Sequence, residues 1–93
     1  MTVPQYCLHI AELLKDSDSS WSDLFNFFAK QYEVDKNDTL TKIRHRYGGM
    51  GSFSDLVLYK DGIFERERMP KLDDLRDGLY DAIVGEIIEL RSQ

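Results

Sequence analysis

Four aspartates gather near the end of the chain: Asp73, Asp74, Asp77 and Asp81. In a helix, the first, third and fourth would fall at i, i+4 and i+8 on one side, where like charges repel by roughly a few tenths of a kcal/mol per pair. A basic protein partner would relieve that repulsion and would be attracted from a distance. The alternative is a solvated face, the commoner origin of such charges, with a helix dipole stabilising Asp73 and Asp74 in the first turn. We interpret the four aspartates as a candidate partner-binding face.

The glycine-rich segment Gly48-Gly49-Met50-Gly51-Ser52-Phe53 is a second candidate. Backbone amides in such a segment can bind a phosphate where a helical turn follows. However, the spacing matches neither the Walker pattern nor the dinucleotide-binding pattern, and the segment follows an expected helix rather than a strand. The simpler interpretation is structural: the glycines end a helix and turn the chain, and Met50 and Phe53 fill the core.

Catalysis by a nucleophile requires a base and an orienting acid beside it, and no spacing in this chain supplies them. Cys7 and His45 can be written as a pair, but nothing in the sequence brings them together. Ser52 and Ser54 lack the Gly-x-Ser-x-Gly pattern. A zinc site needs three or four ligands, and His9 and His45 are the only histidines. We therefore expect no enzyme activity, no catalytic residue, no metal and no cofactor.

Composition and charge restrict the class of partner. The chain has 93 residues and a net charge of −5. This charge argues against nucleic acid, for which a basic face supplies most of the affinity, and against an anionic membrane surface. Cys7 is the only cysteine, as is usual in a reducing cytosol, and we find neither a signal peptide nor an apolar run of about 20 residues. We expect one domain over residues 1–93, cytoplasmic and monomeric.

The hydrophobic pattern predicts a mostly helical α+β fold, with about four helices and a small antiparallel hairpin. The expected helices are 4–15, 21–33, 39–47 and 70–91, with one helical turn at 52–55 and strands at 56–59 and 63–67. The last helix should pack against the first two. Asp61-Gly62 is a type I′ turn signal that pairs Lys60 with Ile63 and Tyr59 with Phe64.

The hairpin leaves two interpretations open. The charged run from Glu65 to Arg68 could protect an open sheet edge from aggregation, which is the more common role of such residues. Alternatively, the hairpin could pair with a strand of a partner. A two-stranded hairpin is marginal in water on its own, so we expect it to pack on the helices or to be completed by a further strand.

Local signals suggest where the helices begin. Ser20 followed by Asp23 resembles a capping box, with Asp in place of the usual Glu. Asn37 or Asp38 can cap the third helix, and Ser52 can cap the short turn after the glycines.

Two further expectations concern helix faces. Phe27 should widen the apolar stripe of the second helix. Gly78 and Gly85 interrupt the last helix, where each costs roughly 1 kcal/mol relative to Ala. Their spacing suggests that another element crosses closely, although a bend is equally allowed.

The segment from Gly48 to Leu58 resembles the Gly-Gly-Met-Gly-Ser-Phe-(Asn/Ser)-Asp-Leu-Val-Leu core of a family of small bacterial proteins whose function is not established. The resemblance extends more loosely to Trp21 with Leu24 and to the leucine-rich last helix. The family often has Asn where Ser54 stands. No catalytic residue is known for the family, so the resemblance assigns none.

A second resemblance concerns size, charge and domain organisation rather than a sequence motif. Small, acidic, single-domain bacterial chains without catalytic motifs are similar to the immunity proteins of contact-dependent growth inhibition and related toxin systems. The resemblance implies a protein that binds and neutralises a cognate toxin domain, such as a basic nuclease, through the four aspartates. The alternatives are a regulatory or adaptor module for a non-toxin partner, and a phosphate-ligand binder or small enzyme that uses the Gly48–Ser52 segment.

Overall fold

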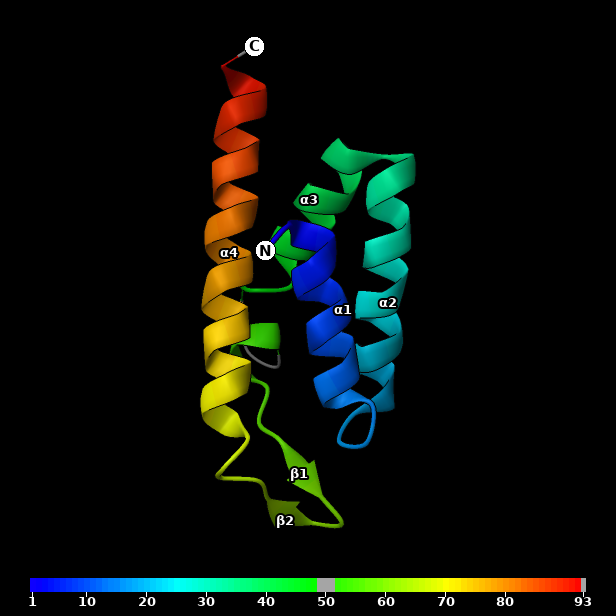
Figure 1. The fold of residues 1–93 in the computed structure, drawn as a ribbon, viewed down its shortest axis with the longest axis vertical. Helices are drawn as coiled ribbons and strands as arrows, with labels where there is room; N and C mark the ends of the chain where they lie inside the picture. The colour runs from blue at the N-terminus through cyan, green and yellow to red at the C-terminus, as the bar shows by residue number, and fades with distance from the viewer. Residues whose placement is uncertain (49–51, 93) are drawn as a thin grey trace.

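Helix α1 lies at the centre of the helical part of the molecule, between α2 and α4 (Figure 1). The structure is a computed structural model that describes residues 1–48 and 52–92. Its elements are, in order, α1 (Val3–Leu14), α2 (Ser19–Val34), α3 (Lys36–His45), the 3₁₀ helix η1 (Phe53–Asp55), β1 (Tyr59–Lys60), β2 (Ile63–Phe64) and α4 (Met69–Arg91). Helix α3 packs against both α2 and α4. The fold is mostly helical α+β with a small antiparallel hairpin, as the hydrophobic pattern predicts.

Aspartates cap the second and third helices. The side chain of Asp18 accepts a hydrogen bond from the backbone N–H of Trp21 (3.2 Å) at the start of α2. Asp35 accepts one from the N–H of Asp38 (3.1 Å) at the start of α3. The predicted caps were Ser20 with Asp23 for α2, and Asn37 or Asp38 for α3. They are wrong because both helices begin before the apolar stripe does, so that these residues lie inside them.

Phe53 fills the centre of an aromatic cluster, as predicted. Its ring centroid lies 4.6 Å from that of Phe25, 5.3 Å from that of Tyr47 and 5.4 Å from that of Trp21. The prediction that Phe27 widens the apolar stripe is wrong, since its side chain is 46% exposed. Two residues beyond the buried Phe25, it points to the far side of the helix.

Helix α4 buries one stripe, formed by Leu72, Leu75, Leu79 and Ile83. The predicted close crossing is present at Gly78, where a Cβ would lie 2.5 Å from the hydroxyl oxygen of Tyr6 on α1. At Gly85 a Cβ would meet nothing within 4 Å, so no element crosses there. A glycine is therefore required by packing at only one of the two positions.

The hairpin has the predicted register, with Tyr59 opposite Phe64 and Lys60 opposite Ile63. Asp61 and Gly62 have φ angles of 53° and 78°, and a type I′ turn requires both to be positive. The predicted bounds 56–59 and 63–67 are wrong. Strand β1 begins only at Tyr59 and includes Lys60, and β2 ends at Phe64 because residues 66–68 form a turn that leads into α4. Before β1, the buried side chain of Leu58 anchors the hairpin in the core.

Candidate functional site

The aspartates of the candidate face, Asp73, Asp74, Asp77 and Asp81, are all exposed on α4. Asp77 is two residues away from both Leu75 and Leu79, which are buried. Because residues two apart point to nearly opposite sides of a helix, Asp77 faces away from the core. The structure therefore presents the predicted binding residues on the outer surface of the longest helix.

Asp73 differs from the other three because it has a cationic partner. Its carboxylate forms an ion pair with Arg76, whose side chain is only 11% exposed. Helix α4 begins at Met69, and no acidic residue lies in its first turn. The dipole stabilisation that we expected for Asp73 and Asp74 is therefore small, since this effect fades beyond the first turn.

Arg76 also holds the segment that follows the glycines against α4. Its guanidinium donates hydrogen bonds to the carbonyl oxygens of Phe53 (2.9 Å), Ser54 (3.1 Å) and Leu56 (3.0 Å). All three bonds come from one terminal nitrogen, Nη1, while Nη2 pairs with Asp73, so the planar group serves both sets of partners. No local pattern predicts this clamp, which joins α4 to the carbonyl oxygens of η1 and of the residue after it.

Asp74, Asp77 and Asp81 carry the unpaired charge of the face, and we call them the acidic strip. Across residues 1–48 and 52–92 no Lys, Arg or His lies within ion-pair distance of any of the three. Their spacing of i, i+3 and i+7 aligns them along one side of α4. The strip is therefore a line of negative charge that α4 itself does not neutralise.

Two tyrosines lie beside the strip. The rings of Tyr47 and Tyr80 are 5.2 Å apart between centroids, and Tyr80 is 39% exposed. Tyr47 donates its hydroxyl hydrogen to the carbonyl oxygen of Arg76 (2.8 Å). Burial raises the pKa of Tyr47 far above its ordinary value, and the nearby charge of Asp77 adds to this effect. Tyr47 therefore remains a neutral donor, and Tyr80 adds apolar surface next to the charges.

Ile88 extends the same face beyond the acidic strip. It is 60% exposed, and it follows Asp81 by seven residues, which is two helical turns. Sequence reasoning missed this residue, although the seven-residue spacing was a usable signal. The outer face of α4 thus has an acidic first half and an apolar residue towards its end.

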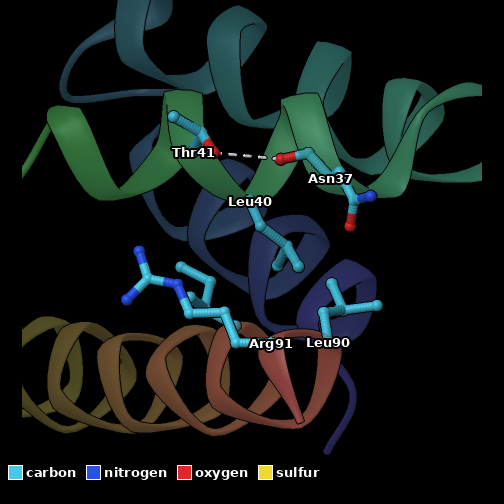
Figure 2. A pocket seen from close by; sticks show the side chains of 6 residues that line it. Asn37, Leu40, Thr41, Leu90 and Arg91 are labelled. Atoms are coloured by element: carbon cyan, nitrogen blue, oxygen red, sulfur yellow. Dashed lines mark hydrogen bonds between the residues drawn. The ribbon is translucent and has the colours of Figure 1, made fainter. Parts of the chain in front are cut away.

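A shallow hollow of about 290 Å³ lies between α3 and the end of α4, as Figure 2 shows. Its lining consists of Asn37, Leu40, Thr41, Ile87, Leu90 and Arg91. Leu40 points across the hollow from α3 towards α4. The volume is at the lower limit for ligand pockets, which have about 300–1,000 Å³. It suits a single apolar side chain of a partner better than a cofactor.

The glycine-rich segment can be assessed only in part, because Gly49, Met50 and Gly51 lie outside the described residues. Gly48 is exposed after the end of α3, and Phe53 is buried. Ser52 occupies the N-cap position of η1 as predicted, but its buried hydroxyl has no hydrogen-bond partner among the described residues and therefore does not cap the turn. Whether the segment cradles a phosphate stays a prediction.

The thiol and imidazole groups are not assembled into a site in the described residues. Cys7 is fully buried, and burial raises the pKa of its thiol to about 12. His9 and His45 are exposed. Within residues 1–48 and 52–92, no group of three or more His, Cys, Asp or Glu side chains could hold a metal ion.

Comparison with known proteins identifies a family for this chain. A family described as a domain of unknown function, DUF6966, matches residues 14–63. The matched segment runs from the end of α1 through α2, α3 and η1 into β2, and ends before α4. No curated protein and no solved structure matches the chain. In the described residues, no helix combines the length and apolar character needed to cross a membrane.

Proposed function

We propose that this chain, which belongs to the DUF6966 family of unknown function, is an immunity protein that neutralises a bacterial toxin domain in the cytosol. The toxin would be a basic nuclease, and the acidic strip on α4 would cover its cleft for nucleic acid. The strip lies outside the matched residues 14–63. The proposal therefore concerns this chain, and the family match does not carry it.

The observation that supports the proposal best is that the negative charge of the acidic strip is not neutralised by an ion pair. Asp74, Asp77 and Asp81 repel one another, none of them has an ion pair among the described residues, and none lies in the first turn of α4. A basic partner would supply the missing charge and would be drawn in by long-range attraction. Tyr80 and Ile88 beside the strip offer the apolar contacts that a stable interface also needs.

The test compares two triple variants with the same change of net charge. Asp74→Asn/Asp77→Asn/Asp81→Asn removes the strip. Its matched control removes three exposed carboxylates elsewhere, by the substitutions Asp16→Asn, Asp23→Asn and Glu33→Gln. The toxin is first recovered with the tagged wild-type protein from the bacterium that makes it, and its nuclease activity is then titrated with each purified protein.

We expect the wild type and the control to silence the nuclease, and the strip variant to bind at least about tenfold more weakly. The affinity of the strip variant should also depend less on salt. Equal affinities of the strip variant and the control would refute the role of the strip. A captured protein that is not a toxin, bound through the same strip, would replace immunity by an adaptor function.

A further inference from the structure

The hairpin exposes an unusual amount of apolar surface for so few residues. Ile63 is 71% exposed, Tyr59 51%, Phe64 43% and Val57 39%. The rings of Tyr59 and Phe64 contact each other across the strands, with their centroids 5.9 Å apart and their planes tilted by 58°. Figure 1 shows the hairpin beyond the ends of the helices, at the opposite end of the molecule from the C-terminus. Tyr59 and Phe64 form an exposed apolar patch on one face of the hairpin, whereas Ile63 points to the other face because successive strand residues alternate. Such an exposed patch indicates an interaction site.

The outer edge of β2 also has free backbone groups. Lys60 pairs with Ile63 next to the turn, and the N–H of Glu65 bonds to the carbonyl oxygen of Leu58 (2.9 Å). In an antiparallel pair the residue between two such positions points its N–H and C=O away from the partner strand. That residue is Phe64. Its backbone groups have no partner in the part of the chain that the structure describes.

A hollow of about 360 Å³ runs beside this edge. Its lining is the continuous run Phe64, Glu65, Arg66, Glu67 and Arg68. Glu65 and Arg68 pair with each other at 3.0 Å. Arg66 and Glu67 remain without an ion pair in the described residues. The hollow beside β2 is therefore lined by one unpaired positive and one unpaired negative side chain.

The equal numbers of positive and negative side chains at the hairpin indicate which partner can bind to this edge. Two copies of a chain with a net charge of −5 repel each other, and the acidic strip would repel its own copy most strongly. At the hairpin, Lys60 and Arg66 balance Asp61 and Glu67, and none of the four has an ion pair within the described residues. A surface with equal numbers of both signs can match itself across a twofold axis.

We propose that β2 pairs with β2 of a second copy of this chain across a twofold axis. The two hairpins would form a four-stranded antiparallel sheet, with Phe64 opposite Phe64 of the second copy. This pairing gives partners to the outward-facing N–H and C=O of Phe64 and adds a cross-strand aromatic pair. It replaces the monomer that we expected from the sequence. It does not depend on the proposed function, because the acidic strip lies on another element.

The first experiment measures the oligomeric state by sedimentation velocity. We expect the full chain to form a dimer as its concentration rises to about 1 mM, a range that detects even weak association. Ile63→Glu should raise the dimer dissociation constant at least about tenfold, because the pairing of Phe64 with Phe64 places position 63 opposite Glu65 of the second copy, where like charges repel. Val34→Glu is the matched control, because Val34 is 78% exposed on α2 and should leave the dimer unchanged. Circular dichroism melting confirms that both variants fold.

The second experiment tests the position of the axis. Phe64→Cys should form a disulfide between two copies on mild oxidation, faster than the control Val34→Cys, because residues opposite each other across a sheet lie within disulfide reach. The buried Cys7 should not contribute. A wild type that stays monomeric to about 1 mM, or a dimer that survives Ile63→Glu, would overturn the proposal. Equal rates of disulfide formation in the two cysteine variants would do the same.

Discussion

The ring of Tyr6 on α1 covers Gly78 of α4 so closely that a Cβ at position 78 would lie 2.7 Å from two of its ring atoms. Gly85, about two turns further along α4, has open space around it, with nothing within 4 Å of a Cβ. The same substitution should therefore have opposite effects at the two positions. Alanine is the better helix former by about 1 kcal/mol, but at position 78 it has to displace an aromatic ring.

We predict that Gly85→Ala raises the free energy of unfolding by about 1 kcal/mol. Gly78→Ala should lower it, because overpacking costs about 1–3 kcal/mol and exceeds the gain in propensity. In a Tyr6→Ala background, which removes the ring, Gly78→Ala should become stabilising. Urea unfolding of the variants measures all three effects. A Gly78→Ala protein as stable as Gly85→Ala would show that the ring moves aside at no cost.

A second prediction concerns the clamp that Arg76 forms on three carbonyl oxygens. Arg76→Lys keeps the charge but replaces two terminal nitrogens by one ammonium, which cannot serve both the carbonyl oxygens, bound by Nη1, and Asp73, bound by Nη2. We expect the free energy of unfolding to fall by about 2 kcal/mol, since charge-assisted hydrogen bonds contribute about 1.5–3 kcal/mol. Asp73→Asn is the control: it removes only the ion pair to a 54% exposed carboxylate and should cost under about 1 kcal/mol. Equal stability of Arg76→Lys and the wild type would contradict the clamp.

The sequence predicts those parts of this fold that depend on local signals. The hairpin register follows from Asp61-Gly62, because two residues with positive φ select one turn and therefore one pairing. The exposed position of Asp77 follows from helical spacing, because its neighbours at ±2 are the leucines of the buried stripe. The ion pair of Asp73 with Arg76, which sequence reasoning missed, has a local origin of the same kind, because the two residues are three apart on one helix.

Other features could not be predicted because they depend on distant parts of the chain. The three carbonyl oxygens that Arg76 binds come from residues 20 to 23 positions earlier. Nothing in the spacing shows where that segment returns to α4. Gly78 and Gly85 look alike in sequence, and only the path of α1 makes one of them essential. The predicted helix caps were wrong for a different reason. A polar run such as Asp16–Ser20 contains several residues that can cap a helix, and which of them does so depends on where the helical backbone begins.

A third prediction concerns pH. Burial raises the pKa of the Cys7 thiol from 9.0 to about 12. The folded protein therefore holds this proton more tightly than the unfolded chain does. The resulting stabilisation is complete below about pH 9 and is lost as the pH rises towards about 12.

We expect the free energy of unfolding to fall by about 1.4 kcal/mol per pH unit above about pH 9. The measurement is urea unfolding with a reductant at several pH values between about 8 and 11. Cys7→Ala should be less stable at every pH because it leaves a cavity, but its stability should be flat up to about pH 10. Tyr47→Phe should reduce the slope only above about pH 10, where the unfolded tyrosine ionises. A Cys7→Ala protein with the slope of the wild type would contradict this account.

A fourth prediction separates the observed caps from those that the sequence suggested. Asp18 accepts a hydrogen bond from the N–H of Trp21, whereas Ser20 lies within α2 and its side chain caps nothing among the described residues. Asp18→Ala should lower the free energy of unfolding by about 1 kcal/mol, and Ser20→Ala should change it little. Because Trp21 packs against Phe53, its fluorescence reports unfolding directly in both variants. If Ser20→Ala proved the more destabilising of the two, α2 would begin at the residue that its apolar stripe indicated, and the capping role of Asp18 would be refuted.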